Sequence, residues 1–217
     1  MITDKTLQRF LPFWEELTDE EKDRLKKSCA LLEFPTGAQI HSGDADCIGV
    51  LLLLEGDLRT YMLSKEGREI TLFQMKEGDV CTLSASCILD AITFDVHIGA
   101  LTDAKVIQVD NSAFQEMAAA NVYMENFIYR AALDRFSDVM WVMEQVLFMS
   151  MDKRLAIFLL DTGPVIPLTH HEIAANLGSA REVVSRMLKY FSDEGLVALS
   201  RGKVTVLDRP GLMKIVS

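Results

Sequence analysis

The 217-residue chain is predicted to be an α+β protein in three parts. Short apolar runs separated by glycines fill residues 31–109, which is typical of strands in a small barrel or sandwich. A long segment without Gly or Pro follows, and the last third contains two short capped helices and a hairpin pattern. We therefore expect a strand-rich domain over 1–111, a linker and long helix over 112–150, and a winged helical domain over 151–217.

Composition and charge indicate a folded chain whose two ends have different partners. Apolar residues make up 49% and charged residues 25%, which is enough to form a core. The net charge is −10, but residues 151–217 carry 9 Lys and Arg against 7 Asp and Glu, whereas the first 150 residues carry 13 against 25. The sequence shows neither a membrane-spanning apolar run nor a secretory signal, so we expect a cytoplasmic protein without membrane contact.

The first part is expected to begin with helices and continue as strands. Thr18 and Glu21 have the spacing of a capping box that opens a helix. The pairs Gly43-Asp44, Gly56-Asp57 and Gly78-Asp79 look like a repeated turn in which glycine supplies a positive φ. The expected strands are 31–34, 49–54, 58–63, 69–73, 80–83, 94–100 and 105–109.

Residues 127–151 are expected to form one helix with two apolar stripes. One stripe could cover the barrel while the other pairs with a second copy of the chain as a short coiled coil. The alternative is a single wide helix buried within a monomer. One stripe contains Phe136, Met140, Met143 and Leu147. The other, which we assign to the dimer interface, contains Ile128, Ala132, Val139, Val142 and Val146.

The segment 168–191 has the pattern of a helix-turn-helix. Thr169 with Glu172 and Ser179 with Glu182 are two capping boxes in series, and Gly178 between them is a typical left-handed helix end. A hairpin turning near residues 201–203 follows and would form a wing. The residues expected to lock the two helices together are Ile173, Leu177, Val183 or Val184, and Leu188.

The second helix of this motif presents polar side chains that suit base recognition. Arginine can donate two hydrogen bonds to guanine, and glutamate can accept one from cytosine N4. The alternative is that these charges form solvated ion pairs on an exposed helix face. The candidate base-reading residues are Arg181, Glu182, Ser185 and Arg186. The candidate phosphate contacts on double-stranded DNA are Thr169, His170, Ser179, Lys189 and Arg201.

These motifs together resemble the CRP/FNR family of transcription regulators over nearly the whole chain. The resemblance is carried by residues 34–40 with Gly43-Asp44, by Leu54-Glu-Gly-Asp57, and by the segment 178–186. It implies a cyclic-nucleotide-binding-type β-roll, a double-stranded β-helix or jelly roll, followed by a winged helix-turn-helix. It also implies a homodimer through the long helix, a palindromic operator with half-sites one helical turn apart, and RNA polymerase as a partner. A TGA-like half-site would place Arg186 on guanine and Glu182 on the opposed cytosine.

The sequence departs from the cyclic-AMP-responsive pattern at the expected effector pocket. Those members carry Arg-Ser/Thr-Ala for the cyclic phosphate, whereas this chain has Phe94-Asp95-Val96 there. A carboxylate would repel a phosphodiester, which argues against cyclic AMP in the usual pose. We therefore expect this region to bind an unknown small-molecule effector of another kind, or none. The candidate pocket residues are Cys81, Thr82, Leu83, Ser84, Phe94 and Asp95.

Other signals and other classes of protein stay open from the sequence. Haem with His41 or His97 as axial ligand, an iron–sulfur cluster on the four cysteines, and a thiol switch of Cys81 with Cys87 are alternatives. The spacing supports no particular metal ligand set, and we expect no catalytic site. The competing classes are a cupin-like barrel enzyme, for which the required His-x-His pair is missing, and a sensor module that binds only proteins.

Overall fold

The computed structural model describes residues 2–43, 48–82 and 95–216, and it has the α+β fold expected from the sequence. Its helices are α1 (Asp4–Phe10), the 3-10 helix η1 (Trp14–Glu16), α2 (Asp19–Lys27), α3 (Asn111–Ala120), α4 (Val122–Phe148), α5 (Met151–Thr162), α6 (His170–Leu177), α7 (Arg181–Asp193) and α8 (Arg209–Val216). Its strands are β1 (Cys29–Phe34), β2 (Gln39–His41), β3 (Val50–Glu55), β4 (Leu58–Leu63), β5 (Glu69–Met75), β6 (Val80–Cys81), β7 (His97–Ala100), β8 (Ala104–Val109), β9 (Val165–Ile166), β10 (Val197–Ser200) and β11 (Lys203–Val206).

The chain divides into two compact units. The first contains Met1–Met62 and Leu72–Val139, and the second contains Leu63–Thr71 and Met140–Ser217. Within the described ranges, none of the helices combines the length and the apolarity that a membrane span requires.

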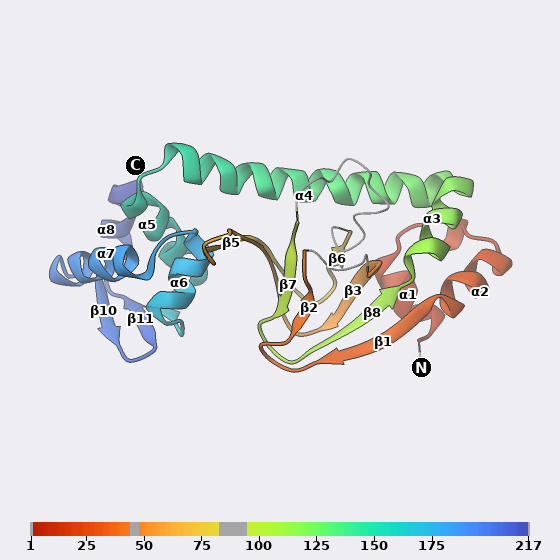
Figure 1. Cartoon of the computed structure of the whole chain (residues 1–217), viewed down its shortest axis with the longest axis horizontal. Coiled ribbons are helices and arrows are strands. Elements are labelled where there is room, and N and C mark those ends of the chain that lie inside the picture. The colour runs from red at the N-terminus through yellow and green to blue at the C-terminus, as the bar shows by residue number, and fades with distance from the viewer. Residues whose placement is uncertain (1, 44–47, 83–94, 217) are drawn as a thin grey trace. The chain divides into compact units, whose positions relative to one another are not determined.

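Two four-stranded sheets form the strand-rich part, in the orders β1-β8-β3-β6 and β2-β7-β4-β5 (Figure 1). The central strand β3 is buried on both faces, which explains its uninterrupted apolar sequence. Leu51 and Leu53 belong to the core that also contains residues of the second sheet, whereas Val50 and Leu52 belong to the core formed with the helices. The period of two along a strand thus lets β3 serve two cores.

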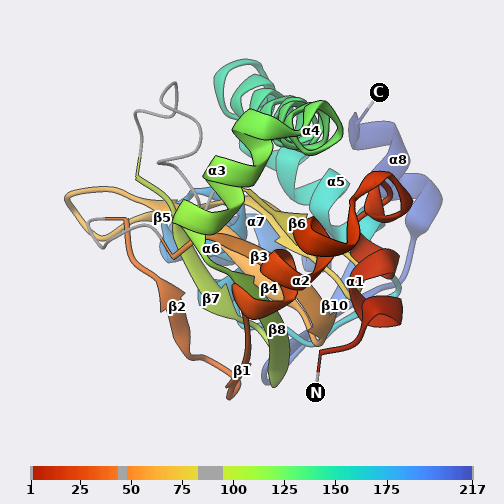
Figure 2. The ribbon, with the colours of Figure 1, turned by 90° about the vertical axis from the view of Figure 1, so that its right-hand side faces the viewer.

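The N-terminal helices and α3 pack against one face of the first sheet (Figure 2). Leu7, Trp14 and Leu25 share a buried cluster with Ile107 of β8 and Phe114 of α3. The predicted capping box of α2 is confirmed, because Thr18 and Glu21 each accept a hydrogen bond from the backbone N–H of the other. The buried cluster thus holds these helices on the sheet, and the cap fixes where α2 begins.

The glycine turns follow the prediction at two of the three positions. Gly56 and Gly78 have φ of +87° and +98°, a backbone conformation that only glycine adopts readily. Gly43 does not have a positive φ; instead, a Cβ atom there would lie 2.4 Å from the Cβ of Asp95. Glycine is therefore required at this position by the close approach of another chain segment and not by a turn conformation.

Helix α4 has 27 residues and ends at Phe148, whereas the sequence predicted one helix over 127–151. It ends because Ser150 adopts an extended backbone and opens the separate helix α5. The two apolar stripes of α4 differ in what they contact within one chain. Ile128 is only 4% exposed and lies in the chain's own core, and Val139 packs on the interior cluster of the strand-rich part. Both side chains therefore pack against residues of their own chain.

The exposed stripe of α4 is the other one. Tyr129, Leu133, Phe136, Met140, Met143 and Leu147 are each at least 44% exposed. They recur at alternating steps of four and three residues, which is the spacing of a coiled-coil seam. Of the five residues predicted for the dimer interface, only Val146 is classed as exposed, and Ala132 and Val142 are partly buried.

The second unit contains the predicted winged helix-turn-helix. The wing strands β10 and β11 pair antiparallel from Val197↔Val206 to Ser200↔Lys203, and they turn at Arg201-Gly202 as expected. The short strand β9 adds a third strand beside β11, which the sequence did not predict. A single buried cluster joins α5, α6, α7, the wing and α8, and so holds the helix-turn-helix on a rigid base.

Candidate nucleic-acid interface

The turn between α6 and α7 is built by two local devices. Thr169 caps α6 as predicted: the Glu172 N–H donates to Thr169 Oγ1 at 3.2 Å, and the Thr169 N–H donates to Glu172 Oε2 at 2.6 Å. Gly178 ends α6 in the left-handed conformation, with φ of +59° and ψ of +38°. These features fix where α6 begins and where the chain reverses toward α7.

The second predicted capping box is wrong. Helix α7 begins at Arg181, and its N-cap is Ala180, which makes no side-chain capping bond. Ser179 lies one residue too early, and its backbone N–H instead donates to the carbonyl of Ala174 at 3.0 Å. Ser179 therefore belongs to the turn, where its hydroxyl stays a candidate phosphate contact.

Apolar contacts lock the two helices, largely as predicted. Ile173 and Leu177 of α6 are buried, as are Val184 and Leu188 of α7, and all four belong to one core cluster. Val184, and not Val183, is the buried member of the valine pair. Since Val184 and Leu188 face inward at a spacing of four residues, the opposite side of α7 faces outward.

A partly buried arginine, which the local sequence pattern does not reveal, also holds the turn. Arg154 of α5 donates a hydrogen bond from Nη2 to the carbonyl of Leu177, in the last turn of α6. Carbonyls at this end of a helix have no partner within the helix, so Arg154 satisfies one of them. Burial lowers the pKa of its guanidinium, although an arginine side chain remains charged at neutral pH.

The outward side of α7 carries charged side chains that are exposed and unpaired. Arg181, Glu182 and Arg186 are exposed, as is Lys189 one turn further on. Among the residues that the structure describes, none lies within ion-pair or hydrogen-bonding distance of the side chains of these four. The alternative of solvated ion pairs between Arg181, Glu182 and Arg186 is therefore not what the structure has.

The remaining candidate contacts lie on other elements of the second unit. Arg201 is exposed in the turn of the wing, and Thr169 is exposed at the start of α6. His170, the first residue of α6, shares a hydrogen bond of 2.9 Å between its Nδ1 and the Ser185 Oγ of α7. Two residues that the sequence placed in different roles, phosphate contact and base reading, are thus in direct contact.

The predicted effector pocket is described only in part. Leu83, Ser84 and Phe94 lie outside the described residues. Cys81 and Thr82 are buried, whereas Asp95 is exposed. Thr82 Oγ1 is a buried hydroxyl that has no hydrogen-bond partner among the described residues, and Thr60 Oγ1 of β4 is a second. Buried hydroxyls usually have a partner, so these two atoms could pair with a bound polar molecule or water.

The side chains considered for metal or redox sensing are described only in part. His41 is buried, and the His97 ring stacks on Tyr61 with centroids 5.3 Å apart. Burial raises the pKa of the Cys29 thiol to about 11, so it is protonated at neutral pH. Cys47 and Cys87 lie outside the described residues. Within the described ranges, no three His, Cys, Asp or Glu side chains are grouped as metal ligands.

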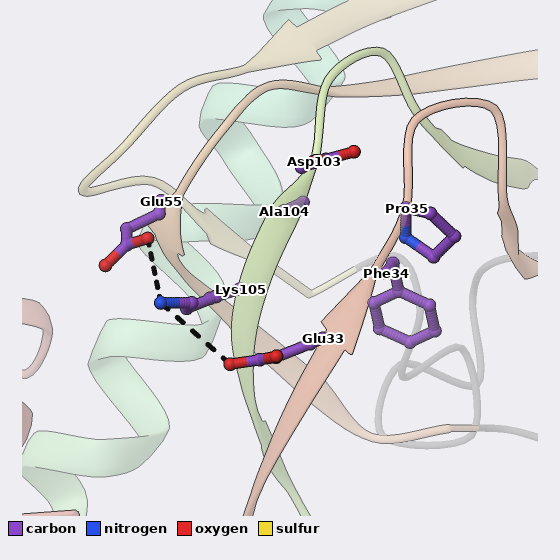
Figure 3. Close-up of a pocket in the computed structure, with 7 residues that line it drawn as sticks. All are labelled: Glu33, Phe34, Pro35, Glu55, Asp103, Ala104 and Lys105. Carbon is purple, nitrogen blue, oxygen red and sulfur yellow. Dashed lines mark ion pairs between the residues drawn. The ribbon is translucent and has the colours of Figure 1, made fainter.

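A pocket of about 370 Å³ lies elsewhere on the strand-rich part, at the ends of β1, β3 and β8 (Figure 3). Lys105 points between two carboxylates there, with Nζ 3.2 Å from Glu55 Oε2 and 3.9 Å from Glu33 Oε1. The pocket shares no residue with the predicted effector pocket. It is lined by Glu33, Phe34, Pro35, Glu55, Asp103, Ala104 and Lys105.

A winged helix-turn-helix whose second helix carries exposed charged side chains on its outward side is typical of one class of protein, the helix-turn-helix transcription regulators. A family model described as the Crp-like helix-turn-helix domain matches residues 153–215. A solved structure from Eubacterium rectale ATCC 33656, described as a transcriptional regulator of the crp/fnr family, is 41% identical with a TM-score of 0.90. That match covers 95% of this chain and 98% of the other. The chain belongs to the CRP/FNR family.

Curated relatives agree over most of their length. The cyclic AMP receptor protein of Thermus thermophilus is 24% identical over 210 residues, which is 94% of this chain and 96% of that protein. The global nitrogen regulator of Synechococcus elongatus is 24% identical over 171 residues, covering 73% and 77% of the two chains. The resemblance predicted from the sequence motifs is thereby confirmed.

Proposed function

We propose that this transcription regulator acts as a homodimer that binds a palindromic DNA operator through the outward side of α7. The observation that carries the proposal is the exposed set of Arg181, Glu182 and Arg186, which no described residue pairs with. A charged surface that is held rigidly and left unpaired is suited to donate and accept hydrogen bonds in a DNA major groove. Arg186 would donate to guanine, and Glu182 would accept from the opposed cytosine.

The second copy of the chain would bind along α4. The exposed seam runs from Tyr129 to Leu147 at the spacing of a coiled coil, and it carries large apolar side chains. A dimer with twofold symmetry places two α7 helices against two half-sites about one helical turn apart. The seam thus explains why the operator would be a palindrome.

The strand-rich part would control DNA binding through a small molecule. The buried hydroxyls of Thr60 and Thr82 support this proposal, since each lacks a partner among the described residues. One relative is named a cyclic AMP receptor protein. In this chain Asp95 stands in the segment where the family's phosphate-binding arginine falls, so we propose an effector without a phosphodiester.

The experiment that tests the DNA proposal is selection from a pool of random duplexes by the full-length protein. We expect a palindromic site with half-sites about 10 base pairs apart, and affinity that falls as salt rises. Recovery of unrelated sequences, or no retention of DNA at low salt, would contradict the proposal. A protein-binding sensor module or a cupin-like enzyme would give this negative result.

A further inference from the structure

We propose that His170 is a positioning residue for base recognition, because it fixes the direction of the Ser185 hydroxyl. This inference rests on the proposed function of α7. His170 opens α6, and Ser185 lies on α7 between the buried Val184 and the exposed Arg186. The 2.9 Å contact between His170 Nδ1 and Ser185 Oγ joins the two helices on the side that would face DNA.

The chemistry of the two groups determines what this hydrogen bond does. A serine hydroxyl has one proton to donate and lone pairs to accept with, and a free hydroxyl rotates to suit either partner. A neutral imidazole has one N–H donor and one acceptor nitrogen, so the role of one ring nitrogen determines the role of the other. Whether the Ser185 hydroxyl donates or accepts in this contact therefore depends on which ring nitrogen of His170 carries the proton.

The second ring nitrogen of His170, Nε2, determines whether Nδ1 donates a hydrogen bond to Ser185 Oγ or accepts one from it. A phosphate oxygen accepts hydrogen bonds, so a contact between phosphate and Nε2 requires the proton to be on Nε2. In the neutral ring Nδ1 is then an acceptor, and Ser185 donates its only proton to it. The Ser185 oxygen can then only accept, and the groups that it can accept from in the major groove are the amino groups of adenine and cytosine.

The contact is held by packing on both sides, so the geometry does not depend on the hydrogen bond alone. Ile173 and Leu177 of α6 pack with Val184 and Leu188 of α7 in one buried cluster. Loss of the His170 side chain should therefore leave the two helices in place and release only the Ser185 hydroxyl. The matched control is His171, the exposed next residue of the same helix.

The test compares His170→Ala, His171→Ala and Ser185→Ala on an operator selected by the unchanged protein, with all four base pairs tried at each position. Ser185→Ala identifies the base pair that Ser185 reads, as the position where discrimination is lost. We expect His170→Ala to reduce discrimination at that same position by about 3- to 10-fold, the value of one hydrogen bond. His171→Ala should leave that discrimination unchanged.

Two further measurements distinguish positioning from a general effect. In the Ser185→Ala background, His170→Ala should change discrimination no further, and removing the contacted amino group from the DNA base should weaken only proteins that retain Ser185. If His170→Ala weakens all sequences equally, or if the amino group makes no difference, the proposal is overturned while specific DNA binding stands. If the unchanged protein itself shows no sequence preference, it is the proposed function that fails.

Discussion

At the scale of single residues, Arg186 and Lys189 are both cations on α7 and should nevertheless behave differently. Arg186 lies among the candidate base-reading residues, and Lys189 is one turn closer to the end of the helix. We expect Arg186→Ala to cost about 1 to 3 kcal/mol of operator binding and to relax preference at one guanine. Lys189→Ala should weaken binding by a similar factor on every sequence. Equal losses on all sequences for both variants in a gel-shift series would make Arg186 a phosphate contact.

A second single-residue prediction concerns Asp110, the N-cap of α3. Hydrogen bonds from the Ser112 hydroxyl and the Ala113 N–H hold the pKa of its carboxyl below the ordinary value. Stabilisation by such a group is present above the pKa of the unfolded chain and is lost as the pH falls through the lower pKa of the folded protein. Asp110→Ala should therefore cost about 1 kcal/mol of unfolding free energy at neutral pH.

The control for this prediction is Asp110→Asn, which keeps a capping acceptor and removes the charge. Urea unfolding at neutral pH and at about pH 3 should show the cost of Asp110→Ala shrinking with acid. The difference between Asp110→Asn and Asp110→Ala should change little, since an amide does not titrate. A cost of Asp110→Ala that stays constant over this range would contradict the electrostatic account.

At the scale of secondary structure, the two stripes of α4 differ in exposure. The seam residues Leu133 and Phe136 are 63% and 61% exposed, whereas Ile128 is 4% exposed. We expect Leu133→Glu with Phe136→Glu to shift the protein from dimer to monomer in sedimentation equilibrium, because charges would enter an apolar seam. Ile128→Ala should instead lower the unfolding free energy by about 2 to 5 kcal/mol and leave the dimer intact.

The matched control for the seam is Asp134→Lys, an exposed position next to Leu133 that is off the seam. Its dimer should remain stable. If Ile128→Ala makes the protein monomeric and leaves its urea midpoint unchanged, the first stripe is the dimer interface. The comparison thus decides between the stripe that the sequence favoured and the stripe that the structure exposes.

The elements show which parts of the molecule follow from local sequence rules and which do not. The capping boxes at Thr18 and Thr169 and the strand at 58–63 depend on neighbouring residues, and the structure has all three. The choice between two equally apolar stripes on α4 depends on which one meets the core, and periodicity alone does not contain that information. The same limit applies to β2 and β9, whose two or three residues carry too few side chains to show a period.

The candidate site divides in the same way. Arg181, Glu182 and Arg186 could be found because their spacing on one helix face follows from the sequence. The failed box at Ser179 arose because capping spacing is tolerant of a shift by one residue, and here the turn uses the Ser179 N–H elsewhere. Arg154 and the contact of His170 with Ser185 join residues that are 23 and 15 positions apart, so only the packed structure brings them together.

At the scale of the whole molecule, net charge and DNA binding are reconciled by where the charge lies. The chain carries −10, but residues 151–217 have 9 basic against 7 acidic side chains, so non-specific attraction to DNA should be weak. If Lys189 and Arg201 of both protomers neutralise phosphates, log Kd should rise with log salt concentration with a slope of about 4. Lys189→Ala should reduce the slope by about 2, since a dimer loses one contact per protomer.

The same titration on a duplex without the operator provides the reference. The affinities for the operator and for the control duplex should differ because of the base contacts of α7. Arg186→Ala should therefore reduce the difference between these two affinities. It should change the salt slope by no more than Lys189→Ala does. A slope near 10 for the unchanged protein would mean that more cations than Lys189 and Arg201 reach the DNA phosphates. With a slope of about 4, little of the affinity would come from charge, and occupancy of the operator should then depend on base contacts and on the spacing between the two α7 helices. That spacing is therefore the quantity that an effector in the strand-rich part would have to control.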